Sequence, residues 1–269
     1  MKKIFNLRDG RKLTVGEKTL ILGIVNVTPD SFSDGGRYLT VDAATAHAKQ
    51  LIDDGADIID IGAESTRPGS TPVSIDEELT RLEKILPAIK SLGAVISIDT
   101  YKPEVAAQAL ELGADILNDV HGLEDSRMLD VIRKSGAPVI AGHCEKCSDD
   151  DIVADVQKFF CRTAAKLPNV QIIFDPGIGF GKTQEENWEL LRRLDELKTL
   201  DGQELTLMLG VSRKSVIGWA TGLPVSERDE MTGALCVHAI TKGVDLVRVH
   251  NVKMISRMCL IIDKLLKGT

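Results

Sequence analysis

The sequence lacks any long apolar run. Although 43% of its 269 residues are hydrophobic, no segment approaches the roughly 18 consecutive apolar residues that a membrane-spanning helix requires. The first ten residues, Met1–Gly10, are mixed in charge and contain no apolar core of the kind found in signal peptides. We therefore expect no membrane partner and a cytoplasmic protein.

Cysteine is scarce and odd in number. The five cysteines, at positions 144, 147, 161, 236 and 259, are irregularly spaced, whereas a disulfide framework normally uses an even set at regular spacings. This usage is typical of a reduced protein, which agrees with a cytoplasmic location.

The sequence also lacks an excess of positive charge. It has 33 Lys and Arg against 40 Asp and Glu, for a net charge of −7. Proteins that bind nucleic acids or anionic membranes usually carry a basic patch or a positive net charge. The composition therefore argues against nucleic acid as a partner, and any anionic ligand must be bound by local cations.

What the sequence does contain is a regular alternation of apolar strand-like runs and helical patterns. Residues 4–15 predict a small hairpin around Asp9-Gly10, a favoured turn pair. Eight strands are predicted at Leu20–Val25, Ile58–Ile61, Val95–Ile98, Ile116–Leu117, Val139–Ala141, Gln171–Phe174, Leu205–Leu209 and Leu246–Val249. Each is followed by a predicted helix, at 42–54, 75–92, 103–113, 125–135, 149–166, 184–198, 227–242 and 252–267.

Eight such units in this length predict a single TIM (β/α)8 barrel domain over residues 1–269, with an N-terminal β-hairpin at 1–15. Glycines at 55, 113 and 243 follow predicted helices and suit left-handed helix ends. The alternative is an open, doubly wound sheet. It would gather ligand contacts at one switch point, whereas here polar motifs follow nearly every strand.

Two carboxylates and an amide stand at the ends of predicted strands. Asp99, Asn118 and Asp175 follow the third, fourth and sixth strands. Because the carboxyl ends of barrel strands meet at one mouth, we expect these side chains to converge. They could bind a flat heterocycle that carries several N–H donors, or they could hold a metal. Asp60 lies within the second strand, so its carboxylate needs a buried partner.

Cationic side chains follow the last two strands. Lys214 comes after the seventh strand, and Arg248 and His250 alternate with valines at the end of the eighth. TIM barrels usually bind phosphate at this position. Asn26 ends the first strand, which neighbours the eighth in a closed ring, so the four residues predict a pocket for a diphosphate and a metal. Arg67, in a loop bounded by glycine and proline, is a further candidate for anion binding.

Two loops complete the predicted mouth. The loop after Asn26 carries Thr28, Asp30, Phe32 and Asp34 over the end of the first strand. The segment Gly177–Thr183 looks like a phosphate loop but fits neither the Walker A spacing nor the Rossmann glycine pattern. We interpret it as a tight loop that presents Phe180.

Taken together, the segments at 23–36, 60–69, 97–103, 175–183 and 211–215 resemble the dihydropteroate synthase family. The resemblance implies a TIM barrel that joins 6-hydroxymethyl-7,8-dihydropterin diphosphate to 4-aminobenzoate and releases pyrophosphate, in folate biosynthesis. It implies Mg²⁺ as cofactor, bound by Asn26, and homodimers.

The resemblance also implies roles for individual residues. The pterin would be bound by Asp99, Asn118, Asp175 and Lys214, and the diphosphate by Arg248 and His250 with Arg67 nearby. The aminobenzoate would be surrounded by Thr66, Pro68, Phe180, Ser212 and Lys214, with Phe32 and Asp34 arriving on the first loop. Asp99, Asp175, Lys214 and Asp34 would be the catalytic set. A dissociative displacement fits the residues, because no Ser–His or Cys–His nucleophile pair is recognisable.

The sequence departs from the family pattern in three places. Ala63 stands where the family commonly has glycine, which is a mild change. Gly142-His143-Cys144 replaces the usual Met-His-Met, which alters apolar packing near the pterin. His143 with Cys144 and Cys147 could suggest zinc, but an adjacent His-Cys pair rarely binds one ion and no second cysteine pair exists. The segment 228–233 also differs, and we expect it to lie away from the site motifs.

Two alternative functions remain open at this stage. One is a corrinoid-dependent pterin methyltransferase, which would share the barrel and the acids but not the Ser212–Lys214 and Arg248–His250 motifs. The other is an inactive paralogue that only binds pterin, which the altered segment at 142–147 suggests.

Overall fold

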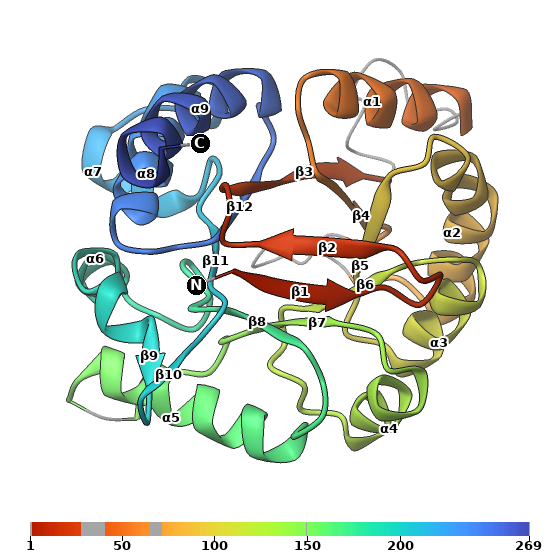
Figure 1. The fold of residues 1–269 in the computed structure, drawn as a ribbon, viewed down its shortest axis with the longest axis horizontal. Helices are drawn as coiled ribbons and strands as arrows, with labels where there is room; N and C mark the ends of the chain where they lie inside the picture. The colour runs from red at the N-terminus through yellow and green to blue at the C-terminus, as the bar shows by residue number, and fades with distance from the viewer. Residues whose placement is uncertain (1, 28–40, 65–71, 149, 269) are drawn as a thin grey trace.

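The computed structural model describes residues 2–27, 41–64, 72–148 and 150–268. In this part of the chain, a barrel of parallel strands is surrounded by helices, and a two-stranded hairpin lies across one end (Figure 1). The barrel strands are β3 (Leu20–Asn26), β4 (Ile58–Gly62), β5 (Val95–Asp99), β6 (Ile116–Asp119), β7 (Val139–Gly142), β8 (Ile172–Asp175), β11 (Met208–Gly210) and β12 (Leu246–Val249). The helices are α1 (Val41–Asp53), α2 (Ile75–Lys90), α3 (Pro103–Glu111), α4 (Ser126–Ser135), α5 (Ile152–Lys166), α6 (Gln184–Arg192), α7 (Ser215–Thr221), α8 (Asp229–Thr241) and α9 (Val252–Lys267). None of the helices in the described ranges is long and apolar enough to cross a membrane.

The barrel closes between its first and last strands in sheet order. That order is β11-β12-β3-β4-β5-β6-β7-β8. Phe174 of β8 forms a parallel bridge with Leu207, and its N–H donates to the Thr206 carbonyl at 2.8 Å. The predicted TIM barrel is confirmed, and the open doubly wound sheet is excluded because such a sheet keeps two free edges. All eight strands are parallel, so their carboxyl ends share one mouth.

Glycines end several helices in the way the sequence predicts. Gly55, Gly113 and Gly243 have φ of +105°, +103° and +90°, a conformation that side chains with a Cβ rarely adopt. Each turns the chain from a helix into the next strand. Thr183 starts α6 with a reciprocal cap, in which its hydroxyl accepts from the Glu186 N–H and the Glu186 carboxylate accepts from the Thr183 N–H.

The seventh unit of the barrel differs in detail from the prediction. The helix predicted at 184–198 ends at Arg192 and continues as a 3₁₀ turn, η2 (Leu194–Leu197), because the chain then folds into the short hairpin of β9 (Thr199–Leu200) and β10 (Gln203–Glu204). The predicted strand Leu205–Leu209 lies later, at Met208–Gly210. Helix α7 was not predicted, and Gly222, at φ +74°, ends it after only two turns.

The N-terminal hairpin plugs the end of the barrel opposite the strand mouths. Strands β1 (Lys3–Asn6) and β2 (Lys12–Val15) pair antiparallel around the predicted turn, where Gly10 has φ of +85°. Their inward side chains join one buried cluster with residues from the beginnings of the barrel strands, among them Phe5, Leu13, Leu22, Ile58 and Ile116. Figure 1 shows β1 and β2 lying across the strands at this end. The predicted hairpin is confirmed, and its role is to cover the apolar floor of the barrel.

Replacing Phe5 with alanine is expected to lower the free energy of unfolding by about 3–5 kcal/mol, as for other buried phenylalanines. Phe5 is 3% exposed within the floor cluster, so the change leaves a cavity there. Urea denaturation measures the effect. Ile4→Ala is the matched control, because Ile4 precedes Phe5 on the same strand and is 46% exposed. Equal losses in the two variants would contradict the plug role.

Candidate active site at the mouth of the barrel

Arg248 joins two acidic residues of the barrel interior. Its Nε donates to Asp60 Oδ2 and its Nη2 donates to Asp99 Oδ2, each at 2.6 Å. Strand β12 pairs with β3, which pairs with β4, so the barrel register brings these residues together from 188 and 149 positions apart. Asp60 and Asp99 are 0% and 4% exposed. The buried partner that Asp60 required is therefore Arg248, a pairing that the sequence did not predict.

Asn118 and Asp99 each present an unpaired acceptor at this end of the barrel. The Asn118 amide group donates to both oxygens of Asp60 at 3.3 Å. Within the described residues, Asp99 Oδ1 and Asn118 Oδ1 are buried oxygens without a hydrogen-bond partner. Buried polar atoms in native proteins are nearly always paired. Two unpaired acceptors on the neighbouring strands β5 and β6 are the arrangement that a ligand with N–H donors would satisfy.

Asp175 and Lys214 form the opposite side of the same mouth. Asp175 Oδ1 accepts from the Gly177 N–H at 2.8 Å. Lys214 Nζ donates to the Ile178 carbonyl and lies 4.3 Å from the centre of the Phe180 ring. The loop that follows β8 thus brings an acid, a cation and an aromatic ring together. This agrees with the prediction that the loop presents Phe180.

Burial shifts the proton affinities of these groups. It raises the pKa of Asp99 to about 7, and the positive charge of Arg248 limits that rise. Burial also raises the pKa of Asp175, with Lys214 opposing. The pKa of Lys214 falls to about 8 because burial disfavours the ammonium, although Asp175 favours it. Buried ionisable groups whose pKa values are shifted, and which lie together at one end of a barrel, are typical of a catalytic site.

Ser212 and His250 meet where the last two strands end. Ser212 Oγ lies 2.9 Å from His250 Nδ1, and it accepts from the His250 N–H at 3.2 Å. Asn26 ends β3, the neighbour of β12 in the sheet, as the closed ring predicts. A Cβ on Gly62 would lie 3.7 Å from Asn26 Oδ1 and from Asp99 Cβ, so Asn26 borders the acidic cluster.

The remaining predicted residues lie outside the described ranges. They are Thr28, Asp30, Phe32, Asp34, Thr66, Arg67 and Pro68. The structure therefore brings together Asn26, Asp99, Asn118, Asp175, Phe180, Ser212, Lys214, Arg248 and His250, all at the carboxyl ends of barrel strands or in the loops that follow them.

Lys182 is a site residue that the sequence reasoning missed. Its ammonium donates to the carbonyls of His143, Gly177 and Phe180 at 3.0–3.1 Å and contacts His143 Nδ1 at 2.7 Å. It therefore stabilises the loop that carries Phe180. The sequence does indicate this role, because Lys182 lies within the glycine-rich segment, and a buried lysine beside tight glycine turns needs several hydrogen-bond acceptors.

The buried His143 ring lies between the side chains of Lys182 and Asp155. Its Nε2 lies 3.3 Å from Asp155 Oδ2, but no hydrogen bond joins the two atoms. Burial, with the nearby Lys182 ammonium, lowers the pKa of His143 to about 4, so the ring is neutral near pH 7. Lys182 contacts the Nδ1 atom of the ring, whereas Nε2 only faces Asp155.

The segment 228–233 does not lie apart from the site, contrary to expectation. Arg228 Nη1 donates to the carbonyls of Arg213 and Lys214 at 3.1 and 3.2 Å. The expectation was wrong because α7 is too short to separate the two segments, so the start of α8 returns to the mouth.

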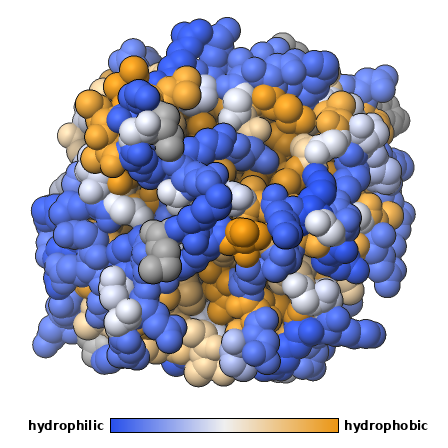
Figure 2. Space-filling view, viewed as in Figure 1, coloured by the Kyte–Doolittle hydropathy of each residue, from blue (hydrophilic) through white to orange (hydrophobic). Residues whose placement is uncertain are grey.

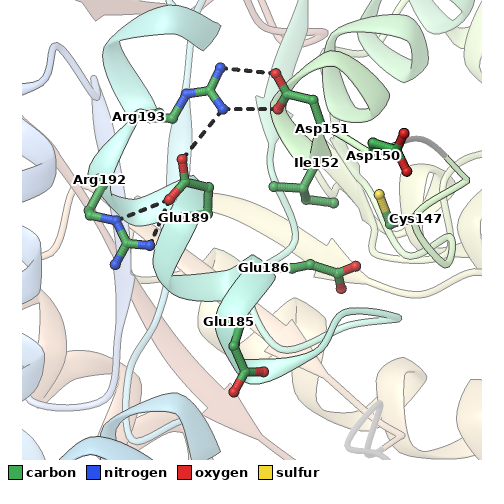
Figure 3. A pocket seen from close by; sticks show the side chains of 9 residues that line it. All are labelled: Cys147, Asp150, Asp151, Ile152, Glu185, Glu186, Glu189, Arg192 and Arg193. Carbon is green, nitrogen blue, oxygen red and sulfur yellow. Dashed lines mark hydrogen bonds and ion pairs between the residues drawn. The ribbon is translucent and has the colours of Figure 1, made fainter.

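A separate pocket of about 360 Å³ lies between α5 and α6 (Figure 3). Acids just before α5 and acids of α6 line it, and Arg193 forms an ion pair with Asp151 at 3.0 Å. None of the predicted site residues borders this pocket, so it is distinct from the strand mouths.

Comparisons with known proteins agree with this geometry. The family model described as pterin binding enzyme matches residues 22–250. The dihydropteroate synthase of Bacillus subtilis is 45% identical over 94% of this chain and 91% of its own length. A Clostridium difficile dihydropteroate synthase structure, determined with pteroic acid, superposes with a TM-score of 0.89 at 44% identity, covering 94% of this chain and 98% of that one. The Xanthomonas albilineans enzyme with 4-aminobenzoic acid gives 0.91 at 36% identity and 99% coverage of both chains.

The barrel and the acids and cations at its mouth define a protein of the pterin-binding enzyme family, to which this chain belongs. Within that family it belongs to the dihydropteroate synthases, which are transferases of folate biosynthesis.

Proposed function

We propose that this chain joins 6-hydroxymethyl-7,8-dihydropterin diphosphate to 4-aminobenzoate, and that its mouth has a heterocycle side and a phosphate side. The observation that carries the proposal is the pair of buried, unpaired acceptors, Asp99 Oδ1 and Asn118 Oδ1, opposite Asp175 and Lys214. A pterin offers ring and amino N–H donors to such acceptors and ring acceptors to a lysine.

The acids on the heterocycle side also suit the chemistry. When the bond between the exocyclic carbon and the diphosphate oxygen breaks, that carbon gains positive charge, which the ring shares. Asp99 and Asp175 stabilise this charge more than the neutral ground state, which is the requirement for catalysis. Pyrophosphate takes the electron pair of the broken bond. The amine nitrogen then bonds to the carbon and loses its proton to solvent.

On the phosphate side, His250, Arg248 and Arg67 would bind the diphosphate. Arg248 is already bound to Asp60 and Asp99, so it acts as part of a network rather than as an isolated cation. Thr66, Pro68, Phe180 and Ser212 would surround the aminobenzoate, with Phe32 and Asp34 from the first loop.

The residues present fit Mg²⁺ as a cofactor. Mg²⁺ usually takes one or two protein oxygens and completes its shell with substrate phosphates and water. Within the described residues no group of three His, Cys, Asp or Glu side chains could hold a metal, so an ion here would depend on Asn26 and the diphosphate. Mg²⁺ would neutralise the charge of the leaving pyrophosphate.

Replacing Asn26 with alanine is expected to weaken Mg²⁺-dependent binding of pyrophosphate at least ~10-fold, as loss of a metal-site partner commonly does. Calorimetric titration of pyrophosphate with and without MgCl₂ measures the effect. Without Mg²⁺ the variant and the original protein are expected to bind equally weakly. A variant that binds Mg²⁺-pyrophosphate as tightly as the original protein would remove Asn26 from the metal site.

Turnover tests the function itself. Purified protein with Mg²⁺ and both substrates is expected to produce dihydropteroate, and tight pterin binding without turnover would instead support the inactive paralogue. The 45% identity to a synthase over 94% of the chain favours the synthase over the methyltransferase alternative. Exchange of labelled pyrophosphate into the pterin diphosphate without aminobenzoate is expected for a dissociative displacement. Strict dependence of exchange on the amine would argue against that order of events.

We propose that the chain works as a cytoplasmic homodimer, with small molecules as its other partners. Exposed apolar side chains of α9 support the dimer: Leu260, Ile261 and Leu265 are 67–75% exposed, and Leu266, near the end of the helix, is 52% exposed. Figure 2 shows apolar side chains gathered over the region of α7 to α9. Contiguous apolar surface of this kind commonly marks an interface.

Replacing Leu265 with aspartate is expected to convert the dimer to a monomer, because it places a charge within the apolar face of α9. Sedimentation equilibrium measures the mass. Ile4→Asp is the control, since Ile4 is also exposed, at 46%, but lies on the hairpin. A Leu265→Asp protein with the same mass as the original would place the interface elsewhere.

A further inference from the structure

Arg213 has an unusual backbone conformation between two site residues. It lies between Ser212 and Lys214 with φ of +59°. This left-handed conformation is unfavourable for residues with a Cβ, and it persists only where surrounding contacts stabilise it. The turn directs Ser212 toward His250 and Lys214 toward Ile178 and Phe180, so whatever maintains it also places these two side chains.

The start of α8 holds this turn in place. Asp229 accepts from Arg213 Nε at 2.6 Å and from Arg213 Nη2 at 2.8 Å, a two-point contact. The Arg213 N–H donates to Thr232 Oγ1 at 3.1 Å. Paired contacts of a guanidinium with a carboxylate fix orientation as well as distance.

Asp229 also contacts the turn after β12, which carries His250. Its Oδ2 accepts from Asn251 Nδ2 at 3.1 Å. Asn251 follows His250 directly, and its Oδ1 caps α9 by accepting from the Met254 N–H at 3.2 Å. One carboxylate therefore binds the turn after β11 and the turn after β12.

We infer that Asp229 is a positioning residue that sets the distance between Lys214 on the heterocycle side of the mouth and His250 on the phosphate side. This inference rests on the proposed function, in which those two residues bind the two halves of one substrate. When two half-sites are held at the right separation, the linked substrate binds far more tightly than either half. Loss of the Arg213–Asp229–Asn251 bridge would reduce that advantage without removing a group that touches substrate.

The test compares a linked ligand with its fragments. Equilibrium binding is measured for 6-hydroxymethyl-7,8-dihydropterin alone, for pyrophosphate with Mg²⁺, and for the pterin diphosphate with Mg²⁺. In Asp229→Ala we expect each fragment to bind within about twofold of the original protein and the pterin diphosphate to bind on the order of 10-fold more weakly. Arg213→Gly is expected to behave in the same way, because glycine keeps the left-handed turn but cannot bind Asp229.

Glu230→Ala is the matched control, since Glu230 lies in the same first turn of α8 and is exposed. It should bind all three ligands as the original protein does. The double variant Arg213→Gly with Asp229→Ala should be no weaker than either single variant, because both remove one bridge. Melting temperatures show whether each variant is folded. A variant that does not fold is replaced by Arg213→Lys, which keeps the positive charge but loses the two-point contact with Asp229.

Two results would overturn the inference. Unchanged binding of the pterin diphosphate in both variants would show that the bridge does not set the distance. An equal loss for the fragments and the linked ligand would show that Asp229 only supports the fold. Failure of the proposed function looks different, because the original protein and Glu230→Ala would then fail to bind the pterin and its diphosphate, and the inference would fall with it.

Discussion

Replacing Arg248 with methionine is expected to lower the free energy of unfolding by about 3–5 kcal/mol, the usual result of removing one partner from a buried ion pair. Methionine leaves Asp60 and Asp99 without the guanidinium that contacts both at 2.6 Å. Neither acid can move into solvent, since both lie inside the barrel. Urea denaturation at pH 8, above the pKa of about 7 that Asp99 has in the original protein, measures the loss.

The control is Arg127→Met, which removes a guanidinium that is 64% exposed and paired with exposed acids. It is expected to change stability little, because solvent screens such pairs. Adding Asp60→Asn to Arg248→Met should recover part of the loss, since one unpaired charge is then removed. A loss no greater than that of the control would mean that Arg248 is not the counter-charge of the two acids.

Replacing Lys214 with methionine is expected to lower kcat/KM by on the order of 10²–10³-fold, as loss of a preorganised polar group commonly does. Lys214 also gives the reaction a pH limit. Burial lowers the pKa of its ammonium to about 8, so the cationic form is present below that pH and disappears above it. In the original protein kcat/KM should therefore fall as the pH rises through about 8, and it should fall on the acid side as Asp99 takes up a proton near its pKa of about 7.

Lys182 also titrates near this range, because burial lowers its pKa to about 8. Lys182→Met is thus the matched variant. It should keep the basic limb of the pH profile, while Lys214→Met should lose that limb and keep the acid one. A Lys214→Met protein whose residual activity still falls through pH 8 would assign the limb to another group.

The polar residues at the ends of the barrel strands could be predicted from the sequence for a physical reason. A buried parallel strand is a run of apolar residues, so Asp99, Asn118 and Asp175 stand out as the polar residues that end such runs. The alternation of strands and helices then places every strand end on one rim. The position of these residues on the rim does not depend on any side-chain contact.

The contacts among those residues could not be predicted in the same way. The pairing of Arg248 with Asp60 depends on the register of β12 against β3 and of β3 against β4. A shift of one residue would turn these side chains to the other face of the sheet. The short helix α7 was also missed, and with it the return of Arg228 and Asp229 to the turn that carries Lys214.

By itself, the sequence determined the alternation of strands and helices, the barrel, the hairpin and the polar residues that end the barrel strands, because periodicity and strand-end polarity are local properties of the chain. Only the tertiary structure decided which of those residues bind one another: Arg248 with two acids, Lys182 with three carbonyls, and Asp229 with two turns. These contacts join residues far apart in the chain, and their geometry depends on register, burial and backbone conformation, which no local pattern specifies.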